Sequence, residues 1–161
     1  MTKLTIILIS ILATAMMRAA QSQKLAKYSV LAVEYIGESD KPITPIVISD
    51  SEAGAAWYRS AVLKRGGSDL TNVHVVSDSL LKRLVSDVDA LKGTLHQKGE
   101  KTFAPSRTVA VRVITPERDD AFLYEMDSAI SLLERLQKSC DKHESLATDL
   151  VHFRDRIRAW K

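Results

Sequence analysis

The last 45 residues constrain the fold most, because no glycine or proline interrupts them between Glu117 and Lys161. Apolar residues recur there in alternating steps of four and three, the spacing that places side chains on one face of an α-helix. The first series is Phe122, Met126, Ala129, Leu133, Leu136 and Cys140, and the second is Leu146, Leu150, Phe153, Ile157 and Trp160. A helical end at residues 116–160 is therefore predicted.

The register of the two series slips after Cys140. Residues 139–141 are poor helix formers, and Asp141 and Glu144 have the spacing of a capping box. We therefore favour two helices that fold back on each other. The alternative is one long, kinked helix, which would leave part of an apolar seam over residues 122–160 for a partner, such as a second copy in a homodimer.

The rest of the chain alternates between strand and helix patterns. Strands are predicted at residues 28–36, 43–48, 75–76 and 109–114, and covering helices at 52–64 and 80–91. The first and last strands are the candidates for the sheet centre, and the first is apolar on both faces in its middle. Pro42 and Pro45 place the second strand at an edge. The prediction is an α/β fold, with α+β as the alternative. It has a mixed sheet of about four strands, two covering helices and a longer C-terminal helical pair.

The first 22 residues have the pattern of a secretory signal peptide. Lys3 supplies a positive start, residues 4–17 carry no charge, and Ala20 and Ser22 are small residues at the −3 and −1 positions of a cleavage site. The apolar run is shorter than the ~20 residues of a membrane span. We expect cleavage after Ser22, which leaves a single α/β domain at residues 23–161 without a membrane span.

Charge and cysteine content narrow the partners and the compartment. The 23 basic residues include Lys3 and Arg18, so removal of the leader leaves 21 basic against 20 acidic residues. A nearly neutral chain does not attract nucleic acid. Cys140 is the only cysteine and Asn72 the only asparagine, so no internal disulfide and no N-glycosylation acceptor is present. These features favour a bacterial protein that is exported to the periplasm or secreted.

Three predicted strands run into a hydroxyl residue that can cap a helix. These residues are Ser49, Ser77 and Thr115, and Asp50 and Asp78 follow the first two. If the strands are parallel neighbours, all three strand ends lie along one edge, where open α/β folds bind ligands. No glycine-rich loop or phosphate-loop lysine accompanies them. Capping is the simpler purpose, and a ligand site is the alternative.

Two further groups have both a functional and a structural interpretation. Cys140 and His143 are close enough on a helix to form a thiolate–imidazole pair, but Cys140 also lies on the apolar seam, where cysteine acts as a small hydrophobe. Arg154, Arg158 and Lys161 fall on one helical face. That face could dock an acidic partner or a membrane surface, and a solvated face is the plainer interpretation.

No sequence motif points to a reaction. The acidic residues at 117–120 are expected to open the helical end, where they complement the helix dipole. We predict no catalytic residue, metal site or cofactor. The first functional hypothesis is an exported, non-catalytic protein that binds a protein or envelope partner through its C-terminal helical region. The alternative is a small exported enzyme or ligand-binding domain that uses the edge at Ser49, Ser77 and Thr115.

Overall fold

A computed structural model describes residues 27–37, 43–64, 70–91, 93–96, 107–140 and 142–159, so the predicted leader and Lys161 lie outside the described residues. The elements are β1 (Val30–Ile36), β2 (Ile46–Ser49), α2 (Glu52–Lys64), β3 (Asn72–Val75), α3 (Asp78–Ala90), β4 (Thr94–His96), β5 (Thr108–Ile114), β6 (Asp119–Glu125), α4 (Met126–Ser139) and α5 (Glu144–Arg158).

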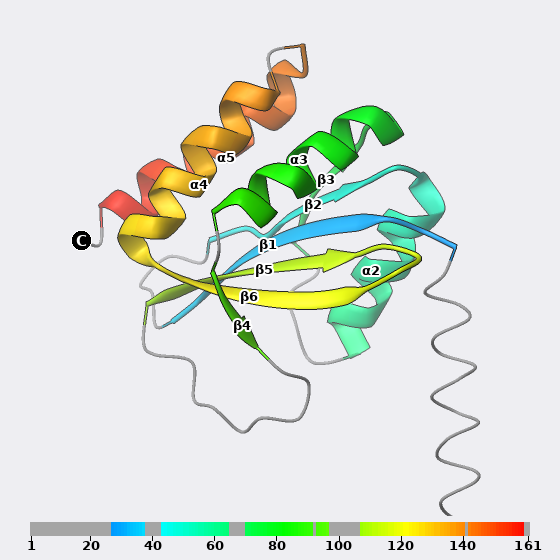
Figure 1. Ribbon diagram of the computed structural model, residues 1–161, viewed down its shortest axis with the longest axis horizontal. Coiled ribbons are helices and arrows are strands. Elements are labelled where there is room, and N and C mark those ends of the chain that lie inside the picture. Colours follow the sequence, from blue (N-terminus) through cyan, green and yellow to red (C-terminus); the bar gives the residue numbers. More distant parts are fainter. Residues whose placement is uncertain are drawn as a thin grey trace, which may run out of the picture.

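The strands form one mixed sheet in the order β3-β2-β1-β5-β6-β4 (Figure 1). β2 and β3 are parallel, and every other neighbouring pair is antiparallel. The mixed α/β fold with a C-terminal helical pair is confirmed. The sheet has six strands in the described part of the chain, and the two that the sequence did not indicate are β4 and β6.

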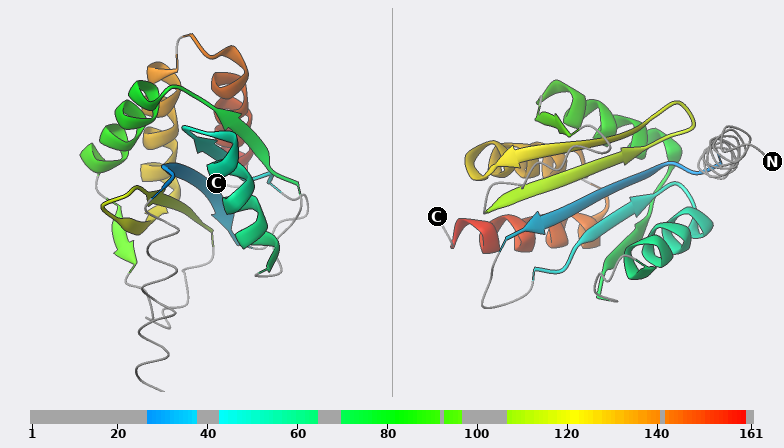
Figure 2. Two further views of the ribbon diagram at one scale, coloured as in Figure 1. Left: turned by 90° about the vertical axis from the view of Figure 1, so that its right-hand side faces the viewer. Right: turned by 90° about the horizontal axis from the view of Figure 1, so that it is seen from below.

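Helices cover the two faces of the sheet unequally. α3, α4 and α5 lie on one face and α2 lies on the other (Figure 2). The larger apolar cluster joins α3, α4 and α5 to one face of the sheet. The smaller cluster joins Tyr58 of α2 to Val30, Ala32, Val47 and Ile114 on the other face. Strand alternation explains this division, because successive side chains of β1 point to opposite faces.

β1 and β5 occupy the centre of the sheet, as predicted, but the prediction that 43–48 forms an edge strand was wrong. β2 pairs with β1 on one side and with β3 on the other. β2 begins at Ile46, so Pro45 lies just before the strand, and Pro42 lies outside the described residues. The carbonyl of Pro45 accepts a hydrogen bond from the backbone N–H of Asn72 at 2.8 Å. A proline just before a strand therefore did not keep β2 from the sheet interior.

The helical end begins at Met126, ten residues later than predicted. Residues 119–125 form β6, which pairs with β5 in a hairpin. The turn is closed by the backbone bonds between Thr115 and Arg118. Arg112 of β5 donates two hydrogen bonds to Asp119, at 2.8 and 2.9 Å. This pairing raises the pKa of Arg112 and offsets the desolvation of its guanidinium. The acidic residues at 117–120 thus serve a hairpin and not a helix start.

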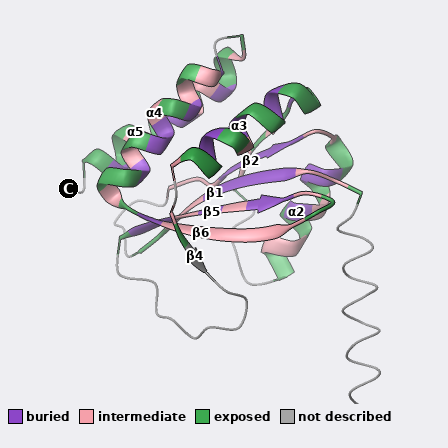
Figure 3. Cartoon of the chain, in the orientation of Figure 1, coloured by how far each residue is buried: buried purple, intermediate pink, exposed green. Residues whose placement is uncertain are grey.

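Two C-terminal helices are present, as favoured from the sequence. α4 ends at Ser139, and the N–H of His143 donates to the carbonyl of Cys140 at 2.7 Å before α5 begins. The buried residues of the two helices are Ala129, Leu132, Leu133, Leu136, Leu146, Leu150, Phe153 and Ile157. Figure 3 shows that buried and exposed stretches alternate along both helices. The apolar seam is thus covered within the chain itself.

Candidate functional site

The three predicted strand ends lie at the same end of the sheet. β2 and β3 are parallel, and β1 is antiparallel to both β2 and β5, so the C-terminal ends of β2, β3 and β5 lie on the same side. Val30, at the start of β1, pairs with Ser49 on one side and Ile114 on the other. The strands that precede Ser49, Ser77 and Thr115 therefore end on the same side of the sheet, but antiparallel β1 separates β5 from β2 and β3, so the three are not parallel neighbours.

The groups around Ser49 bond to one another. Ser49 is fully buried, its hydroxyl donates to the carbonyl of Ser29 at 3.0 Å, and it accepts the N–H of Ser51 at 3.3 Å. The helix cap is Ser51, whose hydroxyl accepts the N–H of Gly54 at 3.1 Å. Asp50 accepts the N–H of Ser29 at 3.3 Å. The helix cap expected at Ser49 is therefore found two residues later, at Ser51.

Gly54 allows the start of α2 to approach this edge closely. A Cβ atom at position 54 would lie 2.5 Å from Oγ of Ser49 and 2.9 Å from Cβ of Tyr28. Neither separation is compatible with ordinary packing. The start of α2 thus encloses the side-chain hydroxyl of Ser49.

The other two strand ends are also bonded locally. Ser77 caps α3 by accepting the N–H of Leu80 at 3.3 Å, and Asp78 pairs with Lys82 at 2.7 Å and raises its pKa through that hydrogen bond. Thr115 bonds to Glu117 in the hairpin turn. Because α2 and α3 lie on opposite faces (Figure 2), their N-termini diverge from the shared edge. Local capping and turn formation account for the contacts of these residues.

The arginines of the predicted interaction face tie α5 to α4. Arg154 donates to Gln137 at 2.9 Å and to Asp155 at 3.0 Å. Arg158 pairs with Glu134 of α4. These contacts give both arginines a role between the two helices.

Cys140 is buried in the large apolar cluster, which agrees with its interpretation as a small hydrophobe. His143 lies at the start of α5, and its backbone N–H donates to the carbonyl of Cys140.

β3 is the outermost strand on one side of the sheet, and its two valines are exposed. β3 is the last strand of the sheet, and Val73 and Val75 are 39% and 48% exposed. Leu70, just before the strand, is 67% exposed. The register with Val47 places Val73 on the face that α2 covers. His74 points to the other face, where its Nε2 atom lies 2.7 Å from Oδ2 of Asp149 on α5.

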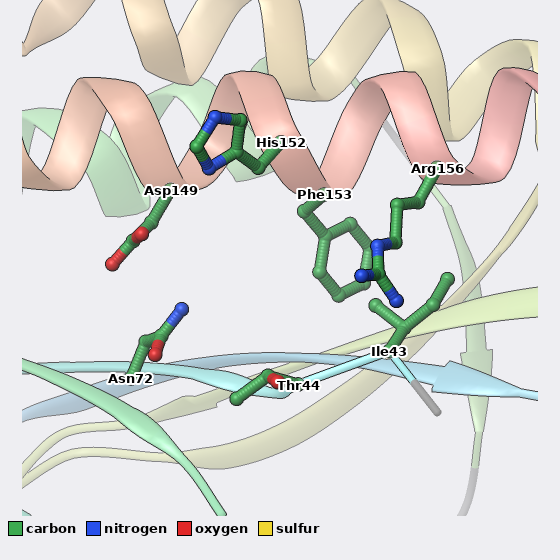
Figure 4. A pocket seen from close by; sticks show the side chains of 7 residues that line it. All are labelled: Ile43, Thr44, Asn72, Asp149, His152, Phe153 and Arg156. Atoms are coloured by element: carbon green, nitrogen blue, oxygen red, sulfur yellow. The ribbon is translucent and has the colours of Figure 1, made fainter. Parts of the chain in front are cut away.

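A cavity of about 150 Å³ lies between α5 and the start of β3. Its α5 wall consists of Asp149, His152, Phe153 and Arg156. The opposite wall consists of Asn72 with Ile43 and Thr44, which precede β2. Figure 4 shows Asp149 facing Asn72 at one end, Arg156 beside Ile43 at the other, and Phe153 between them. The cavity is therefore acidic at one end, basic at the other and apolar in the middle.

The sequence analysis did not predict this cavity, although the spacing of residues along α5 indicates one of its walls. Asp149, His152 and Arg156 are three and four residues apart, so they share a flank of α5 next to buried Phe153. That spacing could have been noticed. Asn72 and Thr44 could not have been added, because only the packing of α5 against the sheet brings them near it.

The described residues contain no group of three or more His, Cys, Asp or Glu side chains that could hold a metal ion. No helix in the described ranges is both long and apolar enough to cross a membrane. No protein-family model, curated protein or solved structure matches the chain.

Proposed function

We propose that the chain is an exported, non-catalytic binding domain that takes an extended segment of a protein partner along the outer edge of β3. The observation that carries this proposal is the exposed, uncharged edge strand itself. Natural sheet edges are usually protected by charged residues, prolines or bulges. β3 reads Asn72-Val73-His74-Val75 and contains neither a lysine nor a proline.

The backbone of β3 offers bonds to such a segment. The N–H groups of Asn72 and Val76 donate toward β2, to Pro45 and Ser49 at 2.8 and 2.9 Å. Because alternate residues of a strand direct their backbone groups to opposite sides, the N–H and C=O groups of Val73 and Val75 point away from the sheet. An added strand would pair with these groups and place alternate side chains against the exposed valines.

The strand is also held in place for binding. The His74–Asp149 contact joins β3 to α5 on one face, and α2 packs beside β3 on the other. A preorganised edge loses less conformational entropy when a partner orders on it. The C-terminal helical region thus contributes α5 as a support for the edge, while its apolar residues are used in the core.

A substitution at Val75 tests strand addition. Val75→Pro removes one outward N–H without touching the bonds to β2, and an edge strand tolerates this. Peptides selected from a random library on the full chain are expected to bind Val75→Pro about tenfold more weakly, the value of one hydrogen bond with local crowding. Calorimetric titration measures the dissociation constants, and Val75→Thr, which keeps the N–H, is the matched control.

Equal binding of the selected peptides to the wild type and to Val75→Pro would contradict strand addition, because it would place recognition elsewhere on the molecule. Light scattering adds one distinction, because a dimer that Val75→Pro dissociates would make a second copy of the chain the strand partner.

The export part of the proposal is tested separately, by the intact mass of the protein recovered from outside the cytoplasm. We expect a mass that lacks residues 1–22. A chain that is retained in the cytoplasm with its first 22 residues would contradict export.

A further inference from the structure

We propose that the segment added to β3 carries a lysine or arginine between two β-branched apolar residues, with its basic side chain next to Asp149. This inference rests on the strand addition proposed above and names the chemistry of the segment that the edge selects. Val73 and Val75 select the apolar residues on one face of the sheet, and the carboxylate of Asp149 selects the cation on the other face.

The side chains of an added strand divide between the two faces of the sheet as those of β3 do. Val73 and Val75 lie on the α2 face and are 39% and 48% exposed, so the residues opposite them pack against valine. The residue between these two stands opposite His74 and therefore lies on the α5 face. A shift by one residue would move every side chain to the wrong face, so the alternating pattern also fixes the register.

Asp149 of α5 is the acidic group beside that central position. Its Oδ2 atom lies 2.7 Å from Nε2 of His74, and its side chain is 26% exposed. Within the described residues, the other carboxylate oxygen has no hydrogen-bond partner. Figure 4 shows the carboxylate directed toward Asn72, at the start of β3. A long side chain opposite His74 can therefore reach an oxygen that accepts hydrogen bonds.

Arg156, a basic residue on the same flank of α5, lies well away from Asp149. It follows Asp149 by seven residues, or about two helical turns, which separates their Cα atoms by roughly 10 Å. Figure 4 places Arg156 beside Ile43, at the opposite end of the cavity. Salt at physiological strength screens exposed charges beyond roughly 8 Å. The charge that a residue opposite His74 meets is therefore chiefly that of Asp149.

The carboxylate distinguishes between the classes of residue that can occupy the central position. A lysine or arginine gains a charge-assisted hydrogen bond. A glutamate or aspartate is repelled, since like charges on adjacent strands destabilise their pairing. An apolar residue removes water from the carboxylate and supplies no hydrogen bond in return. The basic residue is thus the one that the edge favours.

Three capped heptapeptides test this preference. Their sequence is Ser-Thr-Val-Xaa-Val-Thr-Ser, with lysine, alanine or glutamate at the central position, and the blocked ends remove the terminal charges. Each is titrated into the full chain while the backbone amides of Val73 and Val75 are followed by NMR. The lysine peptide is expected to bind about tenfold more tightly than the glutamate peptide, with the alanine peptide between them.

Two variants of α5 assign the preference to one carboxylate. Asp149→Asn is expected to remove the preference for lysine over glutamate, while contacts with the valines keep all three peptides bound. Asparagine retains an oxygen that can accept from His74. Asp155→Asn is the matched control, because Asp155 is 53% exposed and pairs with Arg154 on α5 itself. This control should keep the full preference for lysine.

Equal binding of the three peptides, a preference for glutamate, or a preference for lysine that survives Asp149→Asn would each overturn the inference. Val75→Pro separates that failure from failure of strand addition. If this variant weakens all three peptides equally while none is preferred by the wild type, strand addition stands and the basic residue is wrong. If none of the three peptides binds, the inference falls, and the peptides selected from the library decide strand addition by themselves.

Discussion

Replacement of Asp87 by alanine is expected to lower the free energy of unfolding by about 3 kcal/mol. Asp87 lies on α3 and is only 8% exposed. Its carboxylate accepts Nε–H of Arg135 at 2.7 Å and the hydroxyl of Ser139 at 2.5 Å, both from α4. Arg83 of α3 also donates to the carbonyl of Ser139. Removal of the carboxylate would leave the buried side of this contact without its acceptor, chiefly the hydroxyl of Ser139, and would break the pair with Arg135, whose side chain is 48% exposed.

Chemical denaturation at pH 7 measures this effect, and Asp89→Ala is the matched control. Asp89 is two residues away and pairs with Arg118, but its side chain is 43% exposed. An exposed pair contributes only about 0–1 kcal/mol. A loss below 1 kcal/mol for Asp87→Ala, or equal losses for both variants, would show that the α3–α4 contact is not held by this carboxylate.

The second large effect is expected at alkaline pH and arises from Tyr124. Burial raises the pKa of Tyr124 to about 12, and a backbone hydrogen bond from Gly93 opposes that shift only in part. The tyrosine is 2% exposed and its hydroxyl donates to the carbonyl of Val88 at 3.3 Å. A Cβ atom at Gly93 would lie 2.8 Å from this ring. The ring is therefore enclosed between α3 and the start of β4.

The sign of the pH dependence follows from the raised pKa. Below pH 10, Tyr124 is protonated in both the folded and the unfolded chain, so its contribution to stability is fully present. Between pH 10 and about 12, the unfolded chain ionises while the folded chain stays protonated. Ionisation thus favours unfolding, and stability falls by about 2–3 kcal/mol as the pH rises through this window.

Comparison of the wild type with Tyr124→Phe isolates this term. Urea unfolding at pH 8 and at pH 11.5 gives the loss of stability for each protein. Tyr124→Phe is expected to lose about 2 kcal/mol less than the wild type over this interval, because phenylalanine does not ionise. Identical losses in the two proteins would assign the alkaline sensitivity to other groups.

Part of the fold could be read from the order of residues alone. The apolar steps of four and three after Met126 gave two helices, and the weak helix formers at 139–141 marked the break between them. β1 was recognisable as a central strand because residues 30–33 are apolar on both faces. These features are local, since periodicity and helix propensity depend on neighbours within a few residues.

The misjudged segments are those in which two local patterns compete. Phe122 lies four residues before Met126, as in a helix, but residues 121–124 are also a short apolar and aromatic run between Asp120 and Glu125, as in a buried strand. Pairing of residues 119–125 with β5 decides for the strand, because each backbone group then finds a partner in the sheet. In the same way, β3 makes β2 an interior strand despite Pro45.

The sequence by itself determined the helix pair, the central strands and the α/β class, because short-range spacing encodes them. Only the tertiary structure decided which surfaces are exposed and which polar groups meet. It brings His74 to Asp149 across 75 residues, joins the walls of the cavity at α5, and leaves Val73 and Val75 at the edge of the sheet. Such contacts depend on how whole elements pack, and no spacing along the chain encodes that packing.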